Sequence, residues 1–297
     1  MSGRVALIVN PRAGKDRAGR ELPTLTAALD SAGTSYEISM TEHPGHAVDL
    51  ARQLATAGAS TVVAVGGDGT VNEVVNGLMK VDAAVRPSLG VVAAGSGADF
   101  ARTFDLPEHA DSMLRGVVGT SRTIDVGHMA FGDGSTRHFA NIANIGLAAA
   151  TVERAERLPR RLGKARYVLA LWPVLARYAK CQISVSVDGE PHAEMAYNLL
   201  LANGMYAGGG MHFSPHSDPS DGRLDGQMNI GPKRQAVTLV PKIFRGTHLP
   251  DERILQLSGA EFVIDAERPL MVEADGELIG QTPVTISVIP DAVALIV

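Results

Sequence analysis

Apolar positions in the first 93 residues alternate between short unbroken runs and helical spacing. The apolar runs are residues 5–9, 61–65 and 89–93, residues 36–40 are strand-like, and helical spacing covers 17–32, 47–57 and 70–79. Unbroken apolar runs are typical of strands buried on both faces. The alternation of strand and helix predicts a doubly wound α/β domain with a parallel sheet, which we place at residues 1–122.

The pattern changes after about residue 120. Strands are predicted at 123–129, 138–145, 182–187, 195–201, 254–257, 261–264, 270–273 and 285–289. Hairpin turns are predicted at Gly132-Asp133-Gly134, Asp188-Gly189 and Asp275-Gly276, because Asp-Gly pairs favour two-residue turns. Helical insertions are expected at 151–179 and 233–245. The pattern predicts an antiparallel β domain over 123–297.

Composition narrows the function classes. The chain has 297 residues, 45% hydrophobic and 20% charged, with a net charge of −5, which excludes bulk disorder and a protein that coats nucleic acid. Aromatic residues make up 4%, so base-stacking platforms are not expected, and we predict no nucleic-acid partner. A single cysteine, Cys181, excludes an intrachain disulfide and favours a reducing compartment, the cytoplasm. The longest apolar stretch, 167–176, is half the ~20 residues that a spanning helix needs.

A glycine-rich loop follows the third predicted strand and opens a helix. Glycines let the backbone approach a bulky anion, and a helix N-terminus offers unpaired N–H groups. An acid beside a phosphate is repulsive unless a cation lies between them, which suggests Mg²⁺. The alternative is a tight strand-to-helix turn in which the acid is a helix cap. The loop consists of Gly66, Gly67, Asp68, Gly69 and Thr70.

Two further loops follow the first and fourth predicted strands. The second of them, 95–100, has Phe100 where a dinucleotide fingerprint needs its third glycine, which excludes NAD(H) redox binding and leaves Ser96 and Asp99 as phosphate and metal candidates. All three loops are expected at one edge of the sheet, where open α/β sheets bind ligands. The loop after the first strand is Asn10, Pro11, Arg12, Ala13, Gly14 and Lys15.

With these motifs the sequence resembles the diacylglycerol kinase catalytic family, specifically the bacterial lipid kinases. Further matches are Ile124 to Gly127, Ala202 to Gly210, Asp218 to Asp225 and Asp275 to Glu277. The resemblance implies ATP-dependent phosphorylation of a lipid hydroxyl by a nucleotide domain and a C-terminal β-sandwich-like domain, whose final strand is expected to return to the first domain. The family pattern Thr-x-Asn-Asp-Phe differs here, since Ser96 replaces the threonine and Ala98 the asparagine.

The resemblance also implies roles for individual residues. Glu277 would be the general base, Asp68 and Asp99 would organise a catalytic Mg²⁺, and Asp125 would support their polar network. A second, structural Mg²⁺ would be held by Asp218, Asp221 and the carbonyl of Arg223. ATP would be held by the 10–15 loop, Thr41, Gly66 to Thr70, Val71, Asn72 and Ser96, and Lys164 is a further candidate for its phosphates.

Spacing alone does not distinguish Glu277 from Glu190, since Asp188-Gly189-Glu190 is the same tripeptide as Asp275-Gly276-Glu277. The family order favours Glu277 because it follows the 218–225 segment.

The two helical insertions are basic and amphipathic. Such surfaces suit an anionic membrane, although a solvated helix face packed on the β domain is the common alternative. We therefore expect transient contact with an anionic membrane surface, with a lipid alcohol as substrate. An NAD kinase-like enzyme and a catalytically silent nucleotide- or lipid-binding regulator remain alternatives. The cations are Arg154, Arg157, Arg160, Arg161, Lys164, Arg166, Arg177 and Lys180 in one insertion, and Lys233, Arg234, Lys242 and Arg245 in the other.

Overall fold

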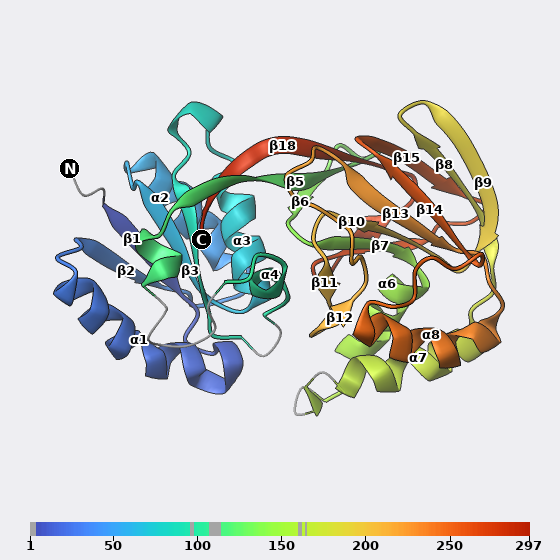
Figure 1. Cartoon of the computed structure of the whole chain (residues 1–297), viewed down its shortest axis with the longest axis horizontal. Helices are drawn as coiled ribbons and strands as arrows, with labels where there is room; N and C mark the ends of the chain where they lie inside the picture. The colour runs from blue at the N-terminus through green and yellow to red at the C-terminus, as the bar shows by residue number, and fades with distance from the viewer. Residues whose placement is uncertain (1–3, 96–97, 107–113, 160–161, 164) are drawn as a thin grey trace. The chain divides into compact units, whose positions relative to one another are not determined.

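The computed structural model describes residues 4–95, 98–106, 114–159, 162–163 and 165–297. It divides into two compact units, residues 1–126 with 290–297, and residues 127–289 (Figure 1). The strands β5 (Ser121–Phe131) and β18 (Val284–Ile296) contribute residues to both units. Among the described residues, no helix is both long enough and apolar enough to cross a membrane.

The first unit contains a parallel sheet, as the alternation predicts. Its strands pair in the order β2-β1-β3-β4, and Leu295 of β18 extends the parallel pairing beside Leu89. Every residue of β1 is buried, as are all but the first residue of β3 and of β4, which explains their unbroken apolar runs. The strands are β1 (Val5–Val9), β2 (Tyr36–Met40), β3 (Thr61–Gly66) and β4 (Ser88–Ala93).

Helices cover both faces of this sheet, so the doubly wound prediction is confirmed. The helix α1 (Ala13–Ser31) packs Leu25 and Leu29 against alternate residues of β1, and α5 (Arg115–Val118) adds Val117 to the same cluster. The opposite face is covered by α2 (His46–Thr56) and α3 (Asp68–Leu78), which contact β1 and β3. Two short helices complete the unit, η1 (Ala83–Val85) and α4 (Asp99–Thr103).

The second unit is an antiparallel β-sandwich, which confirms the predicted class of this half. One sheet has the order β14-β13-β10-β7-β16-β17, and the other places β18, β15, β8 and β9 side by side, with β5 and β6 joined to β18. The strands are β6 (Thr136–Phe139), β7 (Ile142–Gly146), β8 (Cys181–Val187), β9 (Glu190–Ala196), β10 (Asn198–Ala202), β13 (Leu224–Asn229), β14 (Ile254–Gly259), β15 (Glu261–Ala266), β16 (Met271–Ala274) and β17 (Glu277–Gln281). A small hairpin pairs β11 (Tyr206–Ala207) with β12 (Met211–His212).

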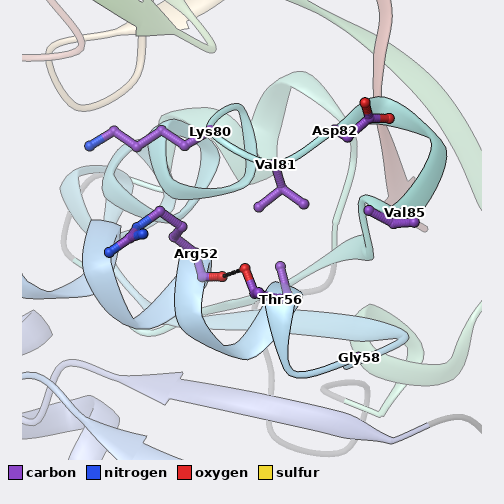
Figure 2. A pocket seen from close by; sticks show the side chains of 8 residues that line it. Arg52, Thr56, Gly58, Lys80, Val81, Asp82 and Val85 are labelled. Atoms are coloured by element: carbon purple, nitrogen blue, oxygen red, sulfur yellow. Dashed lines mark hydrogen bonds between the residues drawn. The ribbon is translucent and has the colours of Figure 1, made fainter.

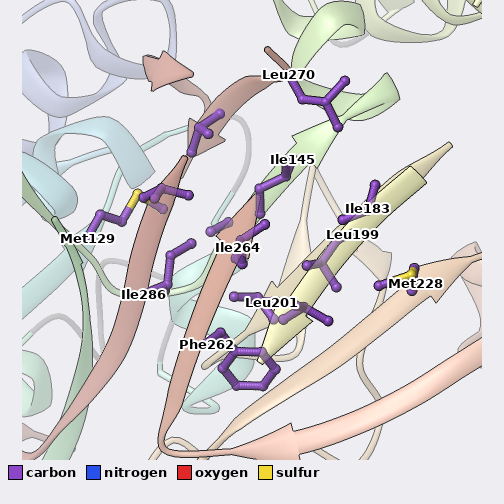
Figure 3. Packing of buried hydrophobic residues seen from close by; sticks show 14 of the residues in the cluster. Met129, Ile145, Ile183, Leu199, Leu201, Met228, Phe262, Ile264, Leu270 and Ile286 are labelled. Carbon is purple, nitrogen blue, oxygen red and sulfur yellow. The ribbon is translucent and has the colours of Figure 1, made fainter. Parts of the chain in front are cut away.

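One hydrophobic core joins the two sheets (Figure 3). Ile145, Leu199 and Leu201 reach it from the six-stranded sheet. Ile183, Phe262, Ile264 and Ile286 reach it from the other sheet. Because side chains alternate between the faces of a strand, residues between these core positions point to the outer face.

Two predicted strands of this unit are wrong as single pieces, and one predicted helical insertion contains two helices. The strand 138–145 is two strands, because the Asp275 carboxylate accepts N–H bonds from Ala140 and Asn141 between them. The strand 195–201 is divided at Tyr197, where the chain passes from one sheet to the other. The insertion 151–179 is two helices, α6 (Leu147–Glu156) and α7 (Ala165–Arg177). The other insertion forms η4 (Lys233–Gln235) and α8 (Ala236–Arg245), close to its predicted range.

Besides the two-residue strands β11 and β12, three strands of this unit have no counterpart in the predicted pattern or lie mostly outside it. β13 contains Gly226 and a buried Gln227, β17 contains Gly280, and β9 is a largely exposed edge strand that contains Pro191. None of them shows a strict alternation of apolar and polar residues, so periodicity does not identify them.

Candidate active site

The carboxyl ends of the parallel strands bring three polar residues together. Asn10 follows β1, and its amide Nδ2 donates to the hydroxyl of Thr70 at 3.2 Å. Thr41 follows β2, and its N–H donates to the carbonyl of Val9 at 2.9 Å. The sheet edge therefore holds Asn10, Thr41 and Thr70 in one place, as the parallel topology predicts.

The glycine loops after β3 and β4 touch backbone to backbone. A Cβ on Gly95 would lie 2.4 Å from the Cα of Gly67, and a Cβ on Gly66 would lie 2.5 Å from the Thr70 hydroxyl. Ala94 N–H donates to Gly66 O at 2.8 Å. Side chains are thus excluded from the junction, and the backbone N–H groups of these loops remain close to any ligand there.

The loop after β1 carries consecutive left-handed residues. Gly14, Lys15 and Asp16 have φ of 59°, 58° and 66°, which interrupts the helical geometry at the start of α1. A Cβ on Gly14 would lie 1.9 Å from Ala94 O, so only glycine fits. Two adjacent non-glycine residues in this region are energetically costly, and such strain clusters at functional sites. Arg12 and Lys15 are both exposed here, which leaves two cations available to a phosphate.

Two carboxylates lie where the glycine loops meet. The Asp68 carboxylate accepts the N–H of Phe100 at 3.0 Å. Asp99 is buried, and Arg102 donates to its Oδ1 at 3.2 Å. Burial and the charge of Asp99 both raise the pKa of the Asp68 carboxyl above its usual range. A cation between the two would relieve this repulsion, so the donor set fits a divalent ion such as Mg²⁺.

The other nucleotide candidates differ in exposure. Val71 and Asn72 are buried inside α3, where Asn72 accepts a bond from the Asn76 amide at 2.8 Å. Pro11 and Ala13 are partly exposed in the loop after β1, and Gly69 is exposed at the start of α3. Ser96 and Lys164 lie outside the described residues. Ala98, the departure from the family pattern, is left-handed at φ 54°.

Asp125 is buried in β5. The Asp291 N–H, from the returning end of β18, donates to its Oδ1 at 2.9 Å. Thr123, two residues earlier, donates to the Asp291 carboxylate. The carboxylate of Asp125 therefore helps attach the end of β18 to β5.

Glu277 follows a tight turn between β16 and β17. Asp275 and Gly276 have φ of 48° and 88°, the pattern of a type I′ hairpin. The Asp275 carboxylate accepts N–H bonds from Ala140, Asn141 and Ile142 at 2.8 to 3.1 Å. The guanidinium of Arg137 donates to Glu277 Oε2. The turn is anchored to neighbouring backbone, and Glu277 itself is partly exposed.

The tripeptide at Asp188-Gly189-Glu190 forms the same kind of turn. Asp188 and Gly189 have φ of 50° and 91°, and the Asp188 carboxylate accepts the N–H groups of Ala260 and Glu261. The two turns differ in the strand that precedes them. Ser186 lies two residues before Asp188, whereas Glu273 lies two residues before Asp275. Glu190 therefore serves as a matched control for Glu277.

Sequence reasoning missed Glu273 and Arg137. Glu273 is 5% exposed and accepts bonds from Asn144 Nδ2 at 3.0 Å and Gly276 N–H at 2.6 Å. Burial is the main cause that raises the pKa of its carboxyl to about 7. No sequence motif marks Glu273 in β16. The one visible signal was a charged residue between two apolar neighbours in a predicted strand.

The predicted second metal segment is a pair of polar turns. Asp218 accepts bonds from the N–H and hydroxyl of Ser220, and Asp221 accepts the Arg223 N–H at 2.9 Å. The side chain of Arg223 donates to the hydroxyl and the carbonyl of Ser258. Both carboxylates are exposed. Their oxygens and the Arg223 carbonyl are the donor type that Mg²⁺ prefers.

A separate hollow lies at the opposite edge of the first unit's sheet (Figure 2). It has a volume of about 480 Å³ and lies where the chain enters β3 and β4, between the end of α2 and residues 80–85. Its lining includes Arg52, Thr56, Lys80 and Asp82. The glycine loops follow the other ends of the same strands, so this hollow is not part of the candidate site.

Family comparisons agree with the two-unit architecture. Residues 4–129 match the family model described as the diacylglycerol kinase catalytic domain. Residues 141–297 match the model described as the YegS C-terminal NAD kinase beta sandwich-like domain. Together the two models cover nearly the whole chain.

Individual relatives match along most of their length. A diacylglycerol kinase of Mycobacterium tuberculosis (strain CDC 1551 / Oshkosh) is 30% identical, with 99% of this chain and 95% of the relative covered. The "Probable lipid kinase YegS-like" of Chromohalobacter salexigens is 32% identical, with 93% and 87% covered. A diacylglycerol kinase of Bacillus subtilis (strain 168) is 28% identical, with 94% and 91% covered.

Solved structures match in fold. A crystal structure of a diacylglycerol kinase from Bacillus anthracis str. Sterne covers 99% of this chain and 96% of its own, at 23% identity and a TM-score of 0.76. A second structure from that organism covers 99% and 97%, at 25% identity and a TM-score of 0.82. The glycine loops, the sandwich and these matches lead to one assignment: the chain belongs to the diacylglycerol kinase catalytic-domain family of lipid kinases.

Proposed function

We propose that this protein transfers the γ-phosphate of ATP to the hydroxyl of diacylglycerol or a related lipid alcohol. The observation that carries the proposal is the Asp68–Asp99 pair where the glycine loops meet, within a chain that belongs to a lipid kinase family. Two mutually repelling carboxylates beside phosphate-binding backbone favour a metal-assisted phosphoryl transfer.

The nucleotide is assigned to the sheet edge of the first unit. Backbone N–H groups of the 66–70 loop would receive the phosphates, with Arg12 and Lys15 adding positive charge. Thr41 and Asn10 would contribute polar contacts, and Val71 and Asn72, both buried in α3, would complete the nucleotide site. Ser96 and Lys164 stay predictions from the family pattern.

Mg²⁺ bound near Asp68 and Asp99 would neutralise charge that develops on the phosphates. Asp68 would hold the ion through water, and its bond to the Phe100 N–H keeps the carboxylate oriented. Asp125 would maintain the geometry of the returning strand β18. Asp218, Asp221 and the Arg223 carbonyl would hold a second, structural ion.

Glu277 is the proposed general base. Its carboxylate would take the proton from the lipid hydroxyl as that oxygen bonds to the γ-phosphorus. The bond from the γ-phosphorus to the bridging oxygen breaks, and ADP leaves with the electron pair. The Asp275–Gly276 turn and Arg137 both limit how far Glu277 moves.

A panel of acceptors tests the function. With radiolabelled ATP and Mg²⁺, the protein is expected to label diacylglycerol, and ceramide and sphingosine serve as related alcohols. Label on NAD with none on a lipid would contradict the proposal in favour of an NAD kinase-like enzyme. No product with any acceptor would favour a silent nucleotide- or lipid-binding regulator.

A basic surface with exposed apolar residues supports membrane contact. Leu169 and Trp172 of α7 are 54% and 43% exposed, and Val237 and Phe244 of α8 are 61% and 48% exposed. Lys233 donates to Ala176 O at 3.0 Å, which attaches the start of the second insertion to α7. Cations beside exposed apolar groups attract anionic lipid by about 1 kcal/mol each. Among the described residues of the two insertions, the exposed cations are Arg154, Arg157, Arg177, Arg234, Lys242 and Arg245.

The protein is therefore expected to sediment with anionic vesicles in low salt and to be released by high salt, as Debye screening weakens surface attraction. Alanine at both Leu169 and Trp172 should reduce the vesicle-bound fraction several-fold. The matched control replaces Met195 and Val263, two exposed apolar residues of β9 and β15, and should leave binding unchanged. Equal recovery with neutral vesicles, or an equal loss in the control, would contradict the assigned surface.

A further inference from the structure

A line of polar side chains crosses three adjacent strands of the six-stranded sheet. Val272 and Ala274 belong to the hydrophobic core, so Glu273 between them points to the outer face. Ala143 and Ile145 are also core residues, so Asn144 points to that same outer face. Asn144 lies directly opposite Glu273 in the register of β7 and β16.

The line is a continuous set of hydrogen bonds. Ala148 N–H, in the first turn of α6, donates to Asn198 Oδ1 at 2.9 Å, and Asn198 Nδ2 donates to Asn144 Oδ1 at 3.2 Å. Asn144 Nδ2 then donates to Glu273 Oε2 at 3.0 Å. The other oxygen, Oε1, accepts Gly276 N–H at 2.6 Å. The start of α6 is thereby linked to the turn that precedes Glu277.

Both oxygens of Glu273 accept bonds from N–H donors. An ionised carboxylate accepts at both oxygens, whereas a protonated carboxyl group has an O–H donor at one of them. If Glu273 gains a proton, one of its carboxylate oxygens becomes an O–H donor that faces an N–H group. The bond to Asn144 or the bond to Gly276 is then lost, because Asn144 is held in its orientation by Asn198. The geometry of the turn thus depends on the charge of a buried side chain.

We propose that Glu273 is a positioning residue for Glu277, whose ionised carboxylate holds the Asp275–Gly276 turn in its working geometry. This inference rests on the proposed role of Glu277 as the general base. Glu273 itself faces the interior between β16 and α6 and does not touch the substrate in this scheme.

The charged groups of the neighbouring elements belong to the turn, to β17 with its partner on β6, and to α6. Asp275 in the turn acts in the same direction as burial on the pKa of Glu273, which is about 7. Glu277 begins β17 and is paired with Arg137 of β6. The helix α6, which packs on β16, carries Arg154, Glu156 and the ion pair Glu153–Arg157. Glu273 is therefore expected to change protonation near neutral pH. This change acts on the turn and is separate from the proton transfer to Glu277.

The variant Glu273→Gln is the direct test. Glutamine has the size of a protonated glutamate, with one acceptor and one donor, so the variant should behave as the wild type does in acid. We expect the two proteins to have kcat within twofold at pH 6, and the wild type to be about tenfold faster at pH 8. The apparent KM for ATP should stay the same, since the nucleotide loops belong to the first unit.

Hydrogen–deuterium exchange of the full chain gives a readout that needs no acceptor. Amides of the 274–277 turn should exchange faster in Glu273→Gln than in the wild type at pH 8, and the matched turn at 187–190 should be unchanged. If Glu273→Gln does not fold, Asn144→Ala removes one of the two donors and should show the same exchange and the same loss of kcat.

The failures of the two hypotheses are distinguishable. Full activity in Glu277→Gln would overturn the assignment of the base and, with it, this inference. If Glu277→Gln is inactive and Glu273→Gln has wild-type kcat and exchange at pH 8, the assignment of the base stands and the positioning role is wrong.

Discussion

Glu277→Gln is expected to lower kcat on the order of a thousandfold, because a general base contributes ~10²–10⁴-fold and glutamine takes no proton. The amide is nearly isosteric, so it still accepts a bond from Arg137, and the Asp275 anchors are untouched. ATP affinity should remain within twofold of the wild type, since the nucleotide loops belong to the other unit. Steady-state rates with diacylglycerol and calorimetric titration with ATP measure the two quantities.

The chain provides its own control for this variant. Glu190→Gln makes the same change after the other Asp-Gly turn and should leave kcat and ATP affinity unchanged. Loss of activity in both variants would indicate a general effect on the sandwich. Wild-type turnover in Glu277→Gln would remove Glu277 from the mechanism.

Asp68→Asn is expected to lower kcat by about 10²–10³-fold, because one fixed charge that faces the metal and phosphates is lost. The asparagine oxygen is still able to accept the Phe100 N–H, so the loop should keep its shape. The raised pKa of Asp68 shows that its ionised form is destabilised in the fold. The melting temperature at neutral pH should therefore stay equal or rise. Initial rates across a Mg²⁺ titration and a thermal melt test both statements.

Asp49→Asn is the matched control in the same unit. Asp49 is exposed in the first turn of α2, and its neutralisation should leave kcat and the Mg²⁺ dependence unchanged. If Asp68→Asn kept wild-type kcat at every Mg²⁺ concentration, the metal assignment at the sheet edge would be wrong.

The first unit was predictable because its signals are local. Buried parallel strands give unbroken apolar runs, and residues that follow their carboxyl ends must meet at one edge. The loops that contain Asn10 and Thr70 were therefore predicted to meet, and the structure joins these two side chains by a hydrogen bond. The start of α1 was less predictable. Gly14 lies close to Ala94, and Lys15 and Asp16 after it are left-handed; the contact with Ala94 is long-range, so the local sequence does not indicate this geometry.

The second unit was less predictable because long-range bonds determine it. The separation of β6 from β7 depends on the carboxylate of Asp275, more than 130 residues later in the chain. The polar line from Asn198 to Glu273 comes from three strands that are neighbours only in the folded sheet. The domain boundary near residue 122 and the assigned roles of the site residues stay predictions.

In the proposed reaction the protein transfers the γ-phosphate of ATP to a lipid hydroxyl, and Glu277 takes the proton. The most direct measurement is label transfer from γ-labelled ATP to diacylglycerol in the presence of Mg²⁺, with wild type and Glu277→Gln assayed side by side. We expect labelled phospholipid from the wild type and at most about a thousandth of that rate from the variant. A wild type that binds ATP yet labels no lipid alcohol, or a variant as fast as the wild type, would contradict it.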